Sequence, residues 1–190
     1  MEPAQTKLKK TAATKYITQL LESGHNKGLK DQMVKWVGDE QGKFDALFGF
    51  LFSGEYRLVQ RAAWPISYIV AKHPELIQKH FDQVILALNQ PDLNDPAKRN
   101  LLRCLQNIKI PKKYGGKIAN ACFNYINDPD ERPSIKAFSI TVLENISKPF
   151  PPLRDELKLI LENRFEYESA AFKSRAQKIL YPIRRGIAKV

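Results

Sequence analysis

Four basic residues recur along this 190-residue chain at nearly constant intervals, and this repeat constrains the fold more than any other feature. Arg61, Arg99, Lys136 and Arg175 are separated by 38, 37 and 39 residues. Small or aliphatic residues follow these bases, which allows close helix packing. A period of about 20 to 50 residues is typical of stacked units, none of which can bury its apolar face alone. The sequence therefore predicts a repeat architecture.

The apolar residues follow a helical period in almost every segment of the chain. Tyr16, Ile17, Leu20 and Leu21 lie at helical spacing, and the segment 44–52 is apolar on nearly every side, as in a helix buried between neighbours. No segment alternates apolar and polar residues long enough to indicate a strand. We therefore expect an all-α fold of about ten helices joined by short turns.

Individual helix boundaries are also indicated by the sequence. A helix is expected from about residue 55 to 72 with Pro65 inside it, and the next is expected to begin at Pro74. Asp95 and Pro96 are expected to be the N-cap and first residue of another helix. Residues 109–116 are expected to form a break, and a final helix is expected from about 169 to 184.

An acidic residue precedes each of the repeated bases, in the turn before its helix. Because stacked repeats align equivalent positions, we expect acid and base to bridge adjacent repeats as a structural ladder. The alternative is a basic strip that binds a ligand. The expected ladder comprises Glu55, Arg61, Asp95, Arg99, Asp130, Lys136, Glu168 and Arg175.

Two short stretches, Val59-Gln60-Arg61-Ala62-Ala63 and Ser174-Arg175-Ala176, resemble the second helix of HEAT repeats, which follows a turn with an acidic residue. The resemblance covers roughly residues 41–184, with a weaker helix pair before it. It implies a right-handed α-α superhelix, an armadillo-type solenoid of about five helix pairs. We expect one domain over residues 1–190, with a flexible basic tail at residues 1–12.

The residue types that carry catalysis or bind metals occur in no recognisable pattern. His73 and His80 are seven residues apart, about two helical turns, so one metal ion cannot bind both. Cys104 and Cys122 are expected to be small core residues, and Trp64 is expected to pack in the core. No zinc motif, nucleophile elbow or phosphate loop is present. We therefore predict no metal and no cofactor, and we favour interaction over catalysis.

Positive charge is concentrated between residues 91 and 120, where seven bases stand against two acids. The run from Lys112 to Lys117 combines cations, an aromatic ring and two glycines beside a helix start, a setting suited to phosphate. The alternative is a solvated turn between repeats. The candidate ligand-binding or phosphate-binding residues are Lys98, Arg103, Lys112, Lys113, Tyr114 and Lys117.

Two functional hypotheses follow from the repeat and from the net charge of +11. The first is a non-catalytic interaction module or scaffold that binds a protein or peptide partner. The alternative is a nucleic-acid-binding protein, because the fold and charge resemble the alkylpurine DNA glycosylases built from HEAT-like repeats. With two cysteines, no secretory signal and no apolar run that could span a bilayer, we expect a cytoplasmic monomer outside the membrane.

Overall fold

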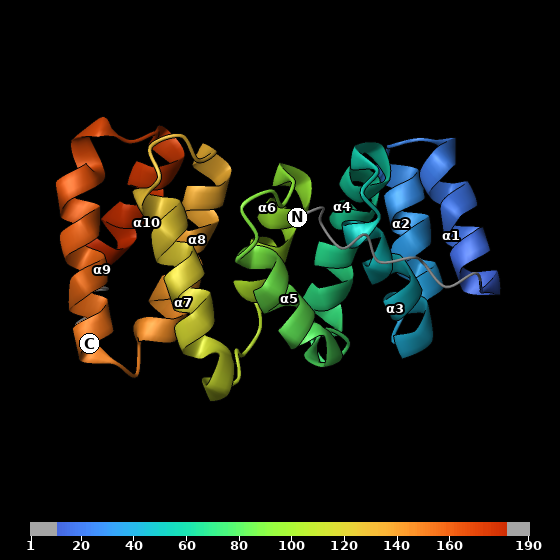
Figure 1. Cartoon of the computed structure of the whole chain (residues 1–190), viewed down its shortest axis with the longest axis horizontal. Coiled ribbons are helices and arrows are strands. Elements are labelled where there is room, and N and C mark those ends of the chain that lie inside the picture. Colours follow the sequence, from blue (N-terminus) through green and yellow to red (C-terminus); the bar gives the residue numbers. More distant parts are fainter. Residues whose placement is uncertain (1–10, 182–190) are drawn as a thin grey trace, which may run out of the picture. The chain divides into compact units, whose positions relative to one another are not determined.

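The structure of this chain is a computed structural model that describes residues 11–181 (Figure 1). These residues form α-helices, short 3-10 turns and connecting loops, with no strand among them, which confirms the all-α prediction. The α-helices are α1 (Ala12–Ser23), α2 (Lys27–Val37), α3 (Gln41–Phe48), α4 (Tyr56–Lys72), α5 (Phe81–Leu88), α6 (Asp95–Leu105), α7 (Lys112–Asn127), α8 (Pro133–Ser147), α9 (Pro151–Arg164) and α10 (Ala170–Leu180).

The helices of residues 11–181 follow one another as five pairs, in agreement with the expected number. We call the first helix of each pair an A helix (α1, α3, α5, α7, α9) and the second a B helix (α2, α4, α6, α8, α10). The repeated bases Arg61, Arg99, Lys136 and Arg175 lie early in four successive B helices. The chain divides into two compact units, unit 1 up to Tyr114 and unit 2 from Gly115.

In unit 1, A helices pack against A helices and B helices pack against B helices. Helix α1 contacts α3, while α2 contacts α4 and α4 contacts α6 (Figure 1). The predicted apolar helix at 44–52 is observed as α3 and the 3-10 turn Gly49–Phe52, and it buries Phe44, Phe48 and Phe50 completely or nearly so. On α4, Ala62 and Ala63 are fully buried, and their small size lets the neighbouring helices come close.

In unit 2 the contacts join both like and unlike helices. Helix α8 contacts both α9 and α10, and α9 contacts α10. Leu157, Leu161, Phe172 and Ala176 from α9 and α10 are fully buried. This apolar burial is the main source of stability, at about 25 cal/mol for each Å² of apolar surface removed from water.

Polar caps define where several helices begin. The side chains of Thr11, Asn26, Asn94 and Ser169 each accept a hydrogen bond from the backbone N–H three residues later. The cap of α6 is therefore Asn94, one residue before the Asp95 that we expected. Such a cap contributes about 1 kcal/mol to helix stability.

The structure differs from the sequence prediction at two helix starts. The prediction of a break at 109–116 is wrong from Lys112 onward, because Gly115 and Gly116 lie inside α7. The buried apolar stripe that begins at Ile118 outweighs the low helix propensity of two glycines, about 1 kcal/mol each. The helix expected from Pro74 begins as α5 only at Phe81, after a 3-10 turn.

Residues 1–10 of the expected tail lie outside the described residues, and Ala12 already begins α1.

A buried polar network holds the turns of unit 2 together. The Nζ of Lys136 donates to Glu168 Oε1 at 2.9 Å and to the carbonyl of Pro129 at 3.4 Å. Arg164 donates through two nitrogens to the same Glu168 oxygen, at 3.0 and 2.7 Å, and also to the carbonyl of Asn127 at the end of α7. The side chains of Lys136 and Glu168 are only 4% and 7% exposed.

The network favours the ionised form of Glu168. Burial by itself raises the pKa of this carboxyl group, but the hydrogen bonds and charges of Lys136 and Arg164 outweigh burial, so the pKa lies below its ordinary value of 4.5. Since the folded-state pKa is lower than the unfolded-state one, the network stabilises the fold above the unfolded-state pKa. Its contribution is lost as the pH falls through the folded-state pKa.

We predict that Gly116→Ala stabilises the protein by about 0.5–1 kcal/mol, because the backbone there is helical and an added methyl group meets open space. The matched control is Gly38→Ala. Gly38 ends α2 with φ of 53°, so alanine there should destabilise by roughly 1–2 kcal/mol. Urea unfolding of both variants measures these changes, and a loss of stability in Gly116→Ala would contradict the helical assignment of this position.

We predict that Glu168→Gln lowers the free energy of unfolding by about 3 kcal/mol near neutral pH, because Lys136 is left buried without a compensating charge. The difference from wild type should shrink as the pH is lowered below about 4.5. Glu162→Gln, at an exposed position of α9, is the control and should change stability little. A difference for Glu168→Gln that stays constant into acid would show that the charge of Glu168 is unimportant.

Candidate functional site

The most distinctive surface feature of unit 1 is a group of cations and aromatic rings on its B helices. Lys30 comes from α2, Trp64 and Tyr68 from α4, and Arg103 from α6. Trp64 and Tyr68 are four residues apart and therefore share one face of α4. Because α4 packs against both α2 and α6, the two rings meet cations from both neighbours. We call these four residues the cation–aromatic cluster.

The geometry of the cluster centres on the ring of Tyr68. The Nζ of Lys30 lies 4.2 Å from the centroid of this ring and 5.8 Å from that of Trp64. The guanidinium carbon of Arg103 lies 5.1 Å from the Tyr68 centroid. The imidazole of His25 lies against Trp64, with the ring centroids 5.2 Å apart. Two cations thus share one aromatic ring, at distances typical of cation–π interactions.

Burial and charge distinguish the members of the cluster. Lys30 is 6% exposed although it carries a charge, while Tyr68 is 37% exposed. Hydrogen bonding with Arg103, and then with Trp64, lowers the pKa of Tyr68, as do the charges of Arg103 and Lys30. The cluster therefore holds its two cations in fixed positions beside an exposed phenol, an arrangement that can bind an anionic group.

Asp31 provides the cluster with a carboxylate of its own. It forms an ion pair with Lys30, and its side chain is half exposed to solvent. The hydrogen bond from Lys30 lowers the pKa of Asp31, with further contributions from the charges of Lys30, Lys27 and Lys72. Asp31 is therefore ionised and surrounded by several cations.

The predicted basic site is spread over two helices. Lys98 and Arg103 lie on α6, and Arg103 belongs to the cation–aromatic cluster. Lys112 and Lys113 are exposed in the first turn of α7 rather than in a loop, and Lys117 is exposed later on α7, in unit 2. Ligand binding by these lysines stays a prediction.

Tyr114 has a different environment from the one we expected. Its ring stacks on Phe81 of α5, with the centroids 5.1 Å apart and the planes 12° apart. Lys113 lies 4.5 Å from the centroid of the same ring. Tyr114 is thus engaged in packing against Phe81, with its adjacent lysine over it.

The expected ladder is brought together at one place, where Lys136 contacts Glu168. Arg61 donates to the carbonyls of Leu21 and Glu22, at 2.6 and 3.2 Å, and thereby ties α4 to the last turn of α1. The remaining members are placed as follows: Glu55, Arg99 and Asp130 are exposed, and Asp95 and Arg175 are half-buried. For these residues the ladder stays a prediction.

Trp64 is only half-buried and belongs to the cluster, so the prediction that it packs in the core is wrong. A signal was available, because Trp64 and Tyr68 are four residues apart while Ala62 and Ala63 occupy the buried side of the same helix. Lys30 and Tyr68 were missed, since nothing in the sequence places residue 30 beside residue 68.

His73, His80 and the two cysteines lie at a helix end, in a polar contact and in the core, respectively. His73 ends α4, and His80 Nε2 lies 2.7 Å from Asp45 Oδ1. Cys104 and Cys122 are buried, and burial raises the pKa of each thiol to about 12. Within residues 11–181, no group of three or more metal-binding side chains lies together.

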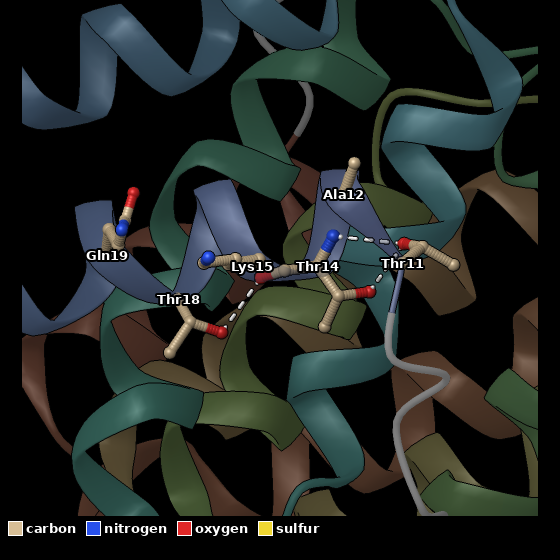
Figure 2. Close-up of a pocket in the computed structure, with 6 residues that line it drawn as sticks. All are labelled: Thr11, Ala12, Thr14, Lys15, Thr18 and Gln19. Carbon is tan, nitrogen blue, oxygen red and sulfur yellow. Dashed lines mark hydrogen bonds between the residues drawn. The ribbon is translucent and has the colours of Figure 1, made fainter.

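A shallow depression along α1 is lined by the residues drawn in Figure 2, namely Thr11, Ala12, Thr14, Lys15, Thr18 and Gln19. Thr11 caps the helix by accepting from Thr14 N, and Thr18 donates to the carbonyl of Thr14 (Figure 2). The hydroxyl groups of Thr11 and Thr18 are therefore used within the helix itself. The cation–aromatic cluster, which combines charge with aromatic surface, is the better candidate.

The comparisons with known proteins agree with the observed helix pairs. None of the helices within residues 11–181 has both the length and the apolar character needed to cross a membrane. No curated protein and no solved structure matches the chain significantly. The family described as HEAT repeat domain matches residues 17–183, which is most of the sequence. Paired helices at a period near 38 residues and this match lead to one conclusion: the chain belongs to the HEAT repeat family.

Proposed function

We propose that this chain is a non-catalytic interaction scaffold that binds a protein partner through the exposed surface of the B helices of unit 1. HEAT repeats generally serve as scaffolds for protein interactions, which makes this the expected class of function. The observation that carries the proposal is the cation–aromatic cluster, because Trp, Tyr and Arg are the residue types enriched at the centres of protein interfaces.

The state of the cluster without a partner supports a binding role. Lys30 and Arg103 are already positioned by Tyr68, so less side-chain entropy is lost when a partner binds. Tyr68 combines an apolar ring with a polar hydroxyl and remains partly exposed. The buried thiols Cys104 and Cys122, with their raised pKa values, are unsuited to act as nucleophiles.

Nucleic-acid binding is a second candidate function, favoured by the net charge of +11. Single-stranded nucleic acids bind largely by stacking bases on exposed aromatic rings. In the cluster, the ring of Tyr68 already lies beside Lys30 and Arg103, and Trp64 lies against His25. Because the faces of both rings already contact other side chains, they offer less surface for stacked bases, which favours a protein partner.

We predict that short peptides selected from a random display library by the full-length chain bind at the cluster. Tyr68→Ala should weaken binding of the selected peptides by about tenfold or more, as expected for an aromatic residue at an interface centre. The control is Leu86→Ala, which removes an even more exposed apolar residue from the A helix α5 (64% exposed, against 37% for Tyr68) and should change affinity less than about twofold.

Two results would contradict the proposal. One is that the folded chain enriches no peptide, and the other is that Tyr68→Ala and Leu86→Ala have equal effects. Duplex and single-stranded DNA are measured alongside at several salt concentrations. Tight DNA binding that falls steeply with salt, in the absence of peptide binding, would establish the nucleic-acid alternative.

A further inference from the structure

We propose that the segment bound by the cation–aromatic cluster is acidic, and that its carboxylates are recognised by Lys30 and Arg103 beside the Tyr68 hydroxyl. This inference rests on the proposed function, because it names the chemistry of the protein partner at the same surface. The occupant is an extended peptide segment rich in Asp or Glu.

Charge complementarity is the first argument. Lys27, Lys30 and Lys72 all lie close enough to Asp31 to lower its pKa, and Arg103 lies on the other neighbour of α4. Several cations therefore lie around Asp31, and two cations lie over the ring of Tyr68. Because like charges repel when they are held together, this surface gains free energy when an anionic group comes among them.

The preorganised positions of the cations are the second argument. Lys30 is almost fully buried, and its ammonium group is held 4.2 Å from the Tyr68 centroid, while Arg103 is held over the same ring. Guanidinium groups form two parallel hydrogen bonds with a carboxylate, and such charge-assisted bonds are about twice as strong as neutral ones. A carboxylate at this position would bond to the partly exposed Arg103, while the charge of the nearly buried Lys30 attracts it.

Asp31 shows that the cluster accepts a carboxylate. Its half-exposed side chain forms an ion pair with Lys30, so one of the two cations already has a carboxylate partner within the chain. An acidic segment would therefore compete with Asp31 for Lys30, and it would also meet Arg103. It follows that removing the charge of Asp31 should strengthen binding of an acidic segment, whereas removing the charge of Arg103 should weaken it.

The experiment measures binding of fluorescent oligoglutamate, oligoglutamine and oligolysine peptides to the full-length chain by anisotropy. We expect oligoglutamate alone to bind saturably. Arg103→Gln should weaken this binding by about tenfold, and Asp31→Asn should strengthen it by about threefold or more. Arg103→Lys keeps the charge but loses the paired guanidinium hydrogen bonds, so its affinity should lie between those of wild type and Arg103→Gln. Circular dichroism checks that each variant is folded.

Two control variants remove the same types of charge, one arginine and one aspartate, from α9 in unit 2. Arg154→Gln removes an exposed arginine from α9, and Asp155→Asn removes the acid that lies 3.3 Å from Lys158. Neither should alter oligoglutamate binding by more than about twofold if the cluster is the site. Equal effects of Arg103→Gln and Arg154→Gln would show that net charge alone attracts the peptide, and the inference would fail.

The remaining outcomes separate this inference from the proposed function. If oligoglutamate does not bind but peptides selected from the random library bind in a Tyr68-dependent way, the acidic chemistry is wrong and the scaffold function stands. If neither binds, both fail. Displacement of oligoglutamate by lower concentrations of single-stranded DNA than of unlabelled oligoglutamate would assign the cluster to phosphate and overturn the inference.

Discussion

Burial of one helix pair by the next is the interaction on which the rest of this structure depends. An isolated pair has an apolar face that remains in water until another pair covers it. In unit 1 the close contacts of α4 with α2 and α6 require the fully buried Ala62 and Ala63. Because α2 and α6 hold α4 from both sides, the face of α4 that carries Trp64 and Tyr68 has a fixed orientation. These two rings therefore lie beside cations supplied by α2 and α6.

The chain uses charged residues in two physically different ways. In unit 2, Lys136 and Glu168 are buried together and their charges compensate each other, which stabilises the turns. In unit 1, Lys30 is also buried, but it lies over aromatic rings, and its ion-pair partner among residues 11–181 is the half-exposed Asp31. Charge that is compensated inside a unit contributes to folding, whereas charge that is held near the surface without full compensation remains available to another molecule.

The architecture could be predicted from the sequence because it depends on local and periodic signals. The bases at 61, 99, 136 and 175 lie on successive B helices, and the expected number of helix pairs was found. Helix ends were less certain, since Gly115 and Gly116 are helical where their propensities indicate a turn. The cluster could not be predicted, because it depends on how residues 30, 68 and 103 are aligned across three helices, and no local pattern specifies that alignment.

The placement of the two thiols gives each unit a separate chemical indicator of its own opening. Cys104 belongs to unit 1 and Cys122 to unit 2, and both are fully buried in the folded chain. A thiol with a pKa of about 12 is almost entirely protonated at neutral pH and reacts with alkylating reagents only after its surroundings open. The rates at which the two cysteines are alkylated therefore report how often each half of the chain unfolds locally, without any label having to be introduced.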